Sequence, residues 1–324
     1  MRMNRMKTLF GSLFLVLTLV SAGLAADYPT KPIRWVNPFA PGGANGLLAL
    51  AFQKSFEKEL GGKVLVENVP GGSTKVGTME VVKAKPDGYT ILIMSDRTWV
   101  FFYYSKVYDI KPWEVMTPIG NLSMEPYAFI DVKADGPYKT WADVVKAAKE
   151  NPGKLTCGGT GAGGAAEYTM NEVTKAAGIK TSYVPFAGGA AAGTALLGGH
   201  IDFRIAAPSD AYPVISAGKT RGLGVGGYTR LKYLPDVPTF KELGLGESAV
   251  FPFTRSVWGP PKLPKNIVTI LTKAMERASK DPEFVKMVET QLRYEVDYMP
   301  PEKLQKETIN FDKMHGPKLA ELSK

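Results

Sequence analysis

A plan that the chain follows twice is the strongest constraint on its fold: strand, glycine-rich turn, helix, strand, glycine-rich turn, helix, strand. The first pass covers residues 33–94 and the second covers residues 154–205. The plan repeats without repeating the sequence itself. Alternating strands and helices are typical of α/β domains with largely parallel sheets, in which ligands bind to loops at the carboxyl ends of the strands. We therefore expect two α/β domains.

Apolar runs, helical spacing and glycine or proline punctuation predict the individual elements. In chain order these are strand 33–36, helix 47–60, strand 64–68, helix 76–84, strand 89–94, helix 141–150, strand 154–157, a helix ending near 177, strand 182–186, helix 190–197, strand 201–205, and helices 266–279, 283–292 and 301–311. The early strand-rich region lacks covering helices, so the C-terminal helices are expected to pack back on it.

This packing predicts a domain division with two crossings. Domain one is expected to comprise residues 27–125 and 228–324, and domain two residues 126–227. The crossings would lie near 123–131 and 222–227. Two crossings provide for a hinge between the domains.

Each of the four glycine turns stands between a strand and a helix, near residues 41–46, 70–74, 158–164 and 187–189. Glycine lets the backbone approach a ligand closely, and the first N–H groups of a helix attract anions. Each such contact contributes on the order of 1 kcal/mol. Two turns from each domain, facing across a cleft, would hold a carboxylate from both sides. For any single turn, a purely structural role is the alternative.

The sequence offers little for catalysis or for metal binding. His200 falls in a turn and His315 on a predicted surface helix, and neither belongs to a nucleophile pattern such as Gly-x-Ser-x-Gly. Cys157 ends an apolar strand, where burial is expected rather than reactivity. No cysteine or histidine group has metal-ligand spacing. We expect no catalytic residue, no metal and no enzymatic activity.

Residues 159–164 match the glycine fingerprint of dinucleotide-binding folds. That fingerprint requires an acidic residue about 20 positions later, at the end of the next strand, to bind the ribose. The corresponding segment, residues 183–186, reads Tyr-Val-Pro-Phe and contains no acid. No dinucleotide cofactor is therefore expected.

The N-terminal segment predicts export. Residues 1–26 combine basic residues, an apolar run from Leu9 to Val20 and small residues before Ala26, which is typical of a cleavable signal peptide. An uncleaved anchor is the alternative, although the apolar run is short for a membrane span. Cys157 is the only cysteine, so no intrachain disulfide can form, and a periplasmic location fits best.

The charge does not indicate a nucleic-acid partner. The formal net charge is +9, and removal of the leader with Arg2, Arg5 and Lys7 leaves +6. The remaining lysines are scattered beside glutamates and form no basic run. Solvated helix faces explain them, and their field attracts anionic solutes mildly.

Two further features bear on a ligand site. Aromatic residues cluster at 99–104, directly after a buried strand, and part of this cluster could line a cleft. Asp202 and Arg204 project from the same face of one predicted strand. Arg204 is a candidate carboxylate clamp, and a local ion pair is the alternative.

Eight short motifs stand in an order and spacing that resemble those of the Bug, or TctC-like, receptors. They occupy residues 28–34, 38–43, 66–72, 86–90, 151–155, 184–186, 197–202 and 234–239. The resemblance covers essentially the whole mature chain. It implies a two-domain, type II-like Venus-flytrap binding protein of the periplasm. Such a receptor delivers a small organic acid to the membrane permease of a tripartite tricarboxylate transporter, and a monomer is expected.

The resemblance also implies which residues bind the ligand. Its ligand loops, together with the candidate clamp Arg204, give the predicted site Phe39, Gly43, Ala44, Asn45, Gly72, Ser73, Thr74, Ser95, Thr160, Gly161, Ala162, Phe186, Ala187, Gly188, Asp202 and Arg204. Gly46 and Leu50 stand where the family commonly has aspartate and arginine. The missing acid speaks against an amino-acid ligand, and the apolar replacements favour an apolar or aromatic carboxylate.

Two other functions remain open at this level. One is a secreted α/β enzyme that acts on a carboxylate. The other is a sensor partner that presents its ligand to a membrane kinase instead of a permease.

Overall fold

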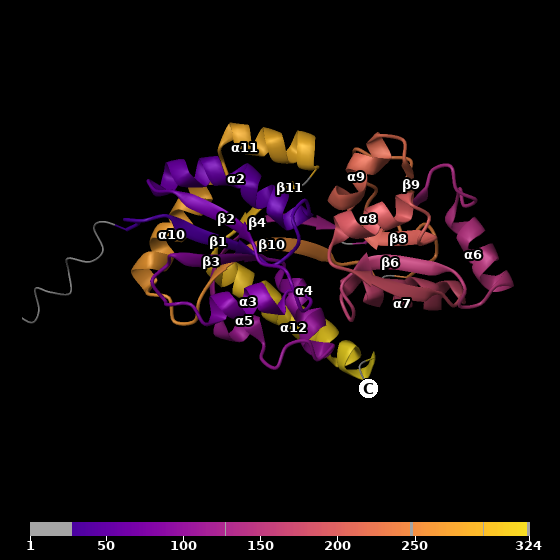
Figure 1. Cartoon of the computed structure of the whole chain (residues 1–324), viewed down its shortest axis with the longest axis horizontal. Coiled ribbons are helices and arrows are strands. Elements are labelled where there is room, and N and C mark those ends of the chain that lie inside the picture. Colours follow the sequence, from indigo (N-terminus) through magenta and orange to yellow (C-terminus); the bar gives the residue numbers. More distant parts are fainter. Residues whose placement is uncertain (1–27, 127, 247–248, 294, 323–324) are drawn as a thin grey trace, which may run out of the picture.

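The computed structural model describes residues 28–126, 128–246, 249–293 and 295–322, and it shows two lobes, each built on its own sheet (Figure 1). The predicted signal peptide, residues 1–26, lies outside the described residues. Within the described part of the chain, no helix is both long and apolar enough to span a bilayer. The same residues contain no group of three or more histidine, cysteine, aspartate or glutamate side chains placed to bind a metal.

The sheet of the first lobe has six strands in the order β11-β4-β10-β3-β1-β2. Strands β1, β2 and β3 run parallel to one another, and β10 is antiparallel to both β3 and β4. The strand bounds are β1 Ile33–Asn37, β2 Val64–Asn68, β3 Thr90–Met94, β4 Thr117–Pro126, β10 Pro252–Gly259 and β11 Glu295–Met299.

The sheet of the second lobe has five strands in the order β7-β6-β8-β5-β9. Strands β6, β7 and β8 are parallel, and β5 lies antiparallel between β8 and β9. The strand bounds are β5 Phe129–Lys133, β6 Thr156–Thr160, β7 Ser182–Phe186, β8 Phe203–Ala206 and β9 Thr220–Val225.

The expectation of largely parallel sheets is therefore only half right, and the crossings explain why. Strand β5 enters the second lobe directly from β4, and β10 returns to the first lobe from the second. Both crossings occur at the edge where the parallel strands end. A strand that enters there must run in the opposite direction, since a parallel pairing needs a long crossover connection. Each sheet thus receives one antiparallel strand from the other lobe.

Helices cover both faces of the first sheet. On one face lie α2 (Ala44–Leu60), α10 (Lys265–Ala278), α11 (Pro282–Met287) and the π-helix η1 (Val288–Leu292), packed on β1 and β3 through a continuous apolar cluster. On the other face lie α3 (Lys75–Val82), α4 (Asp96–Tyr104), α5 (Pro112–Val115) and α12 (Pro301–Leu322). Because both faces are covered, β3 is apolar and buried from Ile91 to Met94, whereas the neighbouring β10 carries the buried polar residues Thr254, Arg255 and Ser256.

The second sheet is covered in the same way. Helices α6 (Trp141–Glu150) and α7 (Ala165–Ala177) lie on one face, and α8 (Gly189–Leu197) and α9 (Pro208–Ser216) lie on the other (Figure 1). A capping box between Thr140 and Asp143 fixes the start of α6. The sequence patterns located α6, α7 and α8 within one or two residues at the ends they specified, whereas α4 and α9 were not anticipated as helices.

The segment after β9 packs on the second lobe. The backbone N–H of Val225 donates to the carbonyl of Pro238, and the N–H of Phe240 donates to the carbonyl of Val225, both at 2.9 Å. Val237 joins a small apolar cluster with Phe129 of β5. The expected boundary at residue 227 assigned this segment to the first lobe. We propose instead that residues 128–246 form the second lobe, because these long-range contacts hold the segment there.

One buried carboxylate ties three elements of the first lobe together. Asp96, the first residue of α4, accepts hydrogen bonds from Thr254 of β10 and, at 2.7 Å, from the hydroxyl of Thr308 on α12. The adjacent Arg97 is also buried and pairs with the same carboxylate. These contacts link the strand that returns from the second lobe to the helices on the face next to the cleft.

Replacing Asp96 with alanine is expected to lower the free energy of unfolding by about 3–5 kcal/mol, since Arg97 then loses its buried counter-charge. Urea denaturation measures this change. Asp135→Ala is the matched control, because its side chain is 76% exposed and pairs only with Lys133, and it is expected to stay within about 0.5 kcal/mol of the native protein. A loss below about 1 kcal/mol for Asp96→Ala would show that this network does not hold the lobe together.

Candidate ligand-binding site

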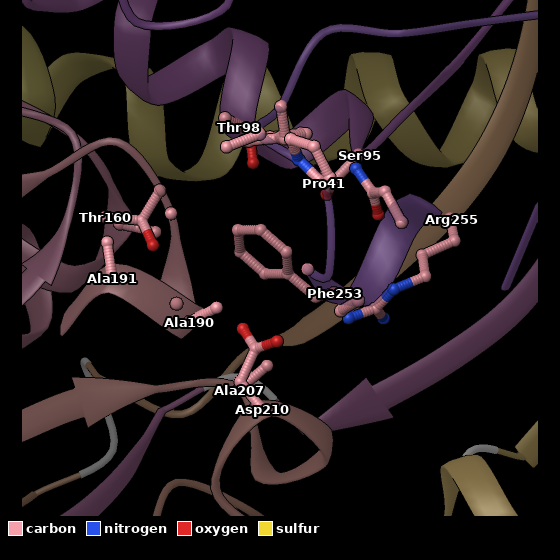
Figure 2. A pocket seen from close by; sticks show the side chains of 18 of the residues that line it. Pro41, Ser95, Thr98, Thr160, Ala190, Ala191, Ala207, Asp210, Phe253 and Arg255 are labelled. Carbon is pink, nitrogen blue, oxygen red and sulfur yellow. The ribbon is translucent and has the colours of Figure 1, made fainter. Parts of the chain in front are cut away.

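A cavity of about 180 Å³ lies between the two lobes, and both lobes line it (Figure 2). The first lobe contributes Phe39, Ala40, Pro41, Gly43, Ala44, Asn45, Ser95, Thr98, Phe102, Phe253 and Arg255, and the second contributes Thr160, Ala165, Gly188, Gly189, Ala190, Ala191, Ala207 and Asp210.

The wall in the first lobe is formed by the turn between β1 and α2. Helix α2 begins at Ala44, so its first N–H groups lie at the cavity. A Cβ atom added to Gly43 would have only the Ala40 carbonyl within 4 Å, at 3.7 Å, which shows that Gly43 faces open space. Ser95 follows β3 and stands at the N-cap position of α4 without a side-chain capping hydrogen bond; it is 2% exposed, and its hydroxyl has no hydrogen-bond partner among the described residues.

The wall in the second lobe is formed by the starts of three helices. Thr160 ends β6, Ala165 begins α7, and residues 188–191 form the beginning of α8. Ala207 and Asp210 come from the beginning of α9. Both walls are thus built at the carboxyl ends of parallel strands, where α/β folds bind ligands.

Most of the lining is apolar. Phe39, Phe102 and Phe253 face the cavity together with several alanines. The expectation that part of the aromatic cluster lines a cleft therefore holds for Phe102, whereas Trp99 and Phe101 are buried in the core. Such a lining accepts an apolar ligand body and leaves orientation to a few polar groups.

Charged side chains form the remaining part of the wall. Arg255 of β10 pairs with Glu125 at the end of β4, and the hydroxyl of Ser209 on α9 donates to the same glutamate at 3.0 Å. This contact joins the lobes beside the crossing. Burial raises the pKa of Glu125, and the nearby Arg255 opposes that rise.

Asp210 is the acidic residue of the cavity wall (Figure 2). Burial raises the pKa of Asp210, and the charges of Arg255 and Arg204 together with the backbone N–H of Ala44, in the opposite lobe, oppose the rise. A Cβ atom on Gly189 would lie 2.2 Å from the Oδ2 atom of Asp210, so the carboxylate rests directly against the start of α8.

Seven of the predicted site residues line the cavity. They are Phe39, Gly43, Ala44, Asn45, Ser95, Thr160 and Gly188. The structure places the other predicted residues outside the lining; they are Gly72, Ser73, Thr74, Gly161, Ala162, Phe186, Ala187, Asp202 and Arg204.

The second glycine turn contacts protein instead of the cavity. The hydroxyls of Thr74 and Tyr108 lie 2.9 Å apart in a hydrogen bond, and Thr74 is buried. A Cβ atom on Gly161 would lie 2.7 Å from the ring of Phe102 and 3.8 Å from the hydroxyl of Ser73. The second and third turns therefore approach each other across the boundary between the lobes.

Arg204 is not placed to clamp a ligand. It is 1% exposed, and its Nε and Nη2 atoms donate to the two carboxylate oxygens of Asp131 at 2.8 and 2.7 Å. Its Nη1 atom donates to the carbonyl of Gly189. The alternative of a local ion pair is correct. The partner lies on the neighbouring strand β5, which strand periodicity cannot reveal.

Asp202 lies at the opposite end of the sheet from the cavity. Its carboxylate accepts hydrogen bonds from the backbone N–H and the hydroxyl of Thr156, at 2.7 and 2.8 Å. Thr156 begins β6, and only the other end of that strand, at Thr160, reaches the cavity. Asp202 therefore stabilises the beginning of β6, next to the beginning of β8.

Position 46 does not face the cavity either. A Cβ atom on Gly46 would lie 2.8 Å from the amide nitrogen of Asn37. The absence of an acid at this position therefore changes the surroundings of Asn37 and leaves the cavity wall unaffected. The sequence-based prediction against an amino-acid ligand assumed that a side chain at position 46 would reach the ligand, and the structure does not support that assumption.

Sequence reasoning missed Asp210 and Arg255 as site residues. Arg255 lies in the middle of β10, a strand that the sequence patterns did not predict. Asp210 followed Pro208 at a helix start that was not recognised. Their roles depend on contacts between lobes, and local patterns carry no information on those contacts.

A family model and curated relatives both match most of this chain. The family model described as "Tripartite tricarboxylate transporter family receptor" matches residues 48–314. An Agrobacterium vitis UPF0065 protein, from the TAR-I ttuE-ttuC' intergenic region, is 31% identical over 285 residues, which cover 87% of this chain and 81% of the relative.

Two solved structures are similar along nearly the whole chain. The periplasmic binding protein BugD is 30% identical with a TM-score of 0.80, covering 91% of this chain and 97% of that chain. MatC from Rhodopseudomonas palustris, solved with bound malate, has a TM-score of 0.82 at 22% identity, covering 92% and 100%. The two-lobed architecture is thus that of periplasmic binding proteins.

Replacing Arg204 with methionine is expected to lower the free energy of unfolding by about 3–5 kcal/mol, because Asp131 then remains buried without its counter-charge. Urea denaturation provides the measurement. Arg221→Met, at an exposed position on β9, is the control and is expected to change stability by less than about 0.5 kcal/mol. Near-native stability of Arg204→Met would contradict a structural role for the pair.

Proposed function

This chain belongs to the tripartite tricarboxylate transporter receptor family, and we propose that it captures a small organic carboxylate in the periplasm and delivers it to the membrane permease of such a transporter. The ligand occupies the cavity between the lobes, one molecule per protein, and the receptor acts as a monomer. The body of the ligand is apolar or aromatic, because the phenylalanine and alanine side chains that line the cavity favour such a body.

The observation that carries this proposal is the convergence of helix starts from both lobes on one cavity. Helix α2 begins there in the first lobe, and α7, α8 and α9 begin there in the second. Backbone N–H groups at helix starts favour anions. The similar protein MatC was solved with malate, a dicarboxylate, which supports a carboxylate ligand for this chain as well.

Closure follows from contacts that a ligand shares between the lobes. A ligand that touches both walls binds the closed form better than the open form and therefore shifts the population toward closure. The crossing between β4 and β5 and the return into β10 act as the hinge.

A thermal-shift panel of mono-, di- and tricarboxylates, aromatic acids and amino acids tests the proposal on the mature chain. Carboxylates of suitable size are expected to raise the melting temperature. Stabilisation only by neutral sugars or by metal ions would overturn the carboxylate assignment. Conversion of a bound carboxylate into product would identify an enzyme instead.

Replacing Gly43 with valine is expected to weaken carboxylate binding by at least about tenfold, or 1.4 kcal/mol, because the side chain would enter the cavity. The fold should tolerate the change, since φ of Gly43 is −83° and the added Cβ meets only the Ala40 carbonyl. Isothermal titration calorimetry with a ligand from the panel measures the affinity. Ala142→Val, on the exposed side of α6, is the control. Undiminished affinity in Gly43→Val would remove this turn from the site.

A further inference from the structure

The carboxylate of Asp210 lies where helix starts from both lobes meet. It lines the same cavity as Ala44, at the beginning of α2, whose backbone N–H favours its ionised form, and it rests against Gly189, at the beginning of α8. Asp210 itself comes from the first turn of α9. Figure 2 shows the carboxylate of Asp210 pointing into the cavity, and the guanidinium of Arg255 lies on the opposite wall.

One anion position of the cavity is therefore occupied by the protein itself. The N–H groups of a helix start attract a negative charge, and here a side chain of the opposite lobe supplies it. A ligand carboxylate could reach Ala44 only by displacing Asp210 or by lying beside it. Two carboxylates that share a site disfavour each other's ionised form.

The arginines near Asp210 are already paired with other carboxylates, so they do not balance the charge of a further anion. Arg204 is engaged by Asp131 in a two-point ion pair, and Arg255 is paired with Glu125. These two pairs are each neutral, so Asp210 is the surplus negative charge of the group. A ligand ammonium beside it would neutralise that charge, whereas a second ligand carboxylate would add to it.

We propose that Asp210 is a specificity-determining residue, which selects a monocarboxylate carrying an ammonium group at its other end and rejects dicarboxylates. This inference rests on the proposed function, because it assumes that a carboxylate enters the cavity.

The opposite part of the cavity suits the ligand carboxylate. Ser95 stands at the N-cap position of α4 and lines the cavity. Its side chain is buried, at 2% exposure, and its hydroxyl has no hydrogen-bond partner among the described residues. Thr98, from the first turn of α4, lines the same wall. Between this wall and Asp210 the lining is mostly apolar, with Thr160 as a polar member, so a hydrocarbon or aromatic body would separate the ligand's two polar ends.

Three matched sets of ligands test the proposal by isothermal titration calorimetry on the mature chain. Each set holds the body constant and changes one end: succinate, 4-aminobutyrate and butyrate; adipate, 6-aminohexanoate and hexanoate; terephthalate, 4-(aminomethyl)benzoate and 4-methylbenzoate. Within the set that fits the cavity, the amino compound is expected to bind at least about tenfold more tightly than the dicarboxylate.

Asp210→Asn keeps the size of the side chain and removes its charge. It is expected to reduce the preference for the amino compound by about tenfold or to reverse it in favour of the dicarboxylate. Asp135→Asn, an exposed position, is the control and should leave the preference unchanged. Asp210→Ser is the second variant, used if the melting temperature shows that Asp210→Asn does not fold.

The outcomes separate this inference from the proposed function. Tightest binding of the dicarboxylate by the native protein, or an unchanged preference in both Asp210 variants, would overturn the role of Asp210 and leave carboxylate binding intact. No binding of any of the nine compounds would also overturn it. If the wider carboxylate panel then produced no thermal shift, the proposed function would fail as well.

Discussion

The structure depends on the direction in which its strands run. In each lobe three parallel strands end at one edge, and the helices that follow them begin there. The chain crosses between the lobes at that same edge, so β5 and β10 enter antiparallel. Strand ends, helix starts and crossings are thereby gathered around one cavity. The lining of the cavity comes from both lobes, and a ligand that contacts both can therefore favour the closed form.

Buried charge is the second organising feature. Asp131 with Arg204 and Glu125 with Arg255 form pairs beside the crossings, and Asp96 with Arg97 forms another beneath the cavity wall. Burying such groups is costly unless partners and hydrogen bonds satisfy them. The pairs hold the walls in place, and they leave Asp210 as the carboxylate that a ligand meets. Stability thus depends on these pairs, and the proposed selectivity depends on Asp210 beside them.

Much of the fold could be predicted because its signals are local. The first and fourth glycine turns, Ser95 and Thr160 were singled out from local patterns, and the structure places them in the lining of the cavity. Arg204 was misassigned because its partner Asp131 is 73 residues away in the chain. The segment 231–245 was assigned to the first lobe, and we propose the second lobe because its contacts with β9 and β5 are made by tertiary packing.

The sequence by itself determined the family, the α/β class and the positions of the parallel strands β1–β3 and β6–β8, of most helices and of the glycine turns, whereas β4, β5, β9, β10 and β11 were not predicted. Periodicity and turn chemistry act over a few residues, and they are therefore legible without a structure. Only the tertiary structure decided which turns reach the cavity, that Arg204 is buried in a pair, and that Asp210 lies in the cavity wall. Those outcomes depend on which side chains meet across strands and lobes, and burial with pairing sets the energy of a charge more strongly than its place in the chain.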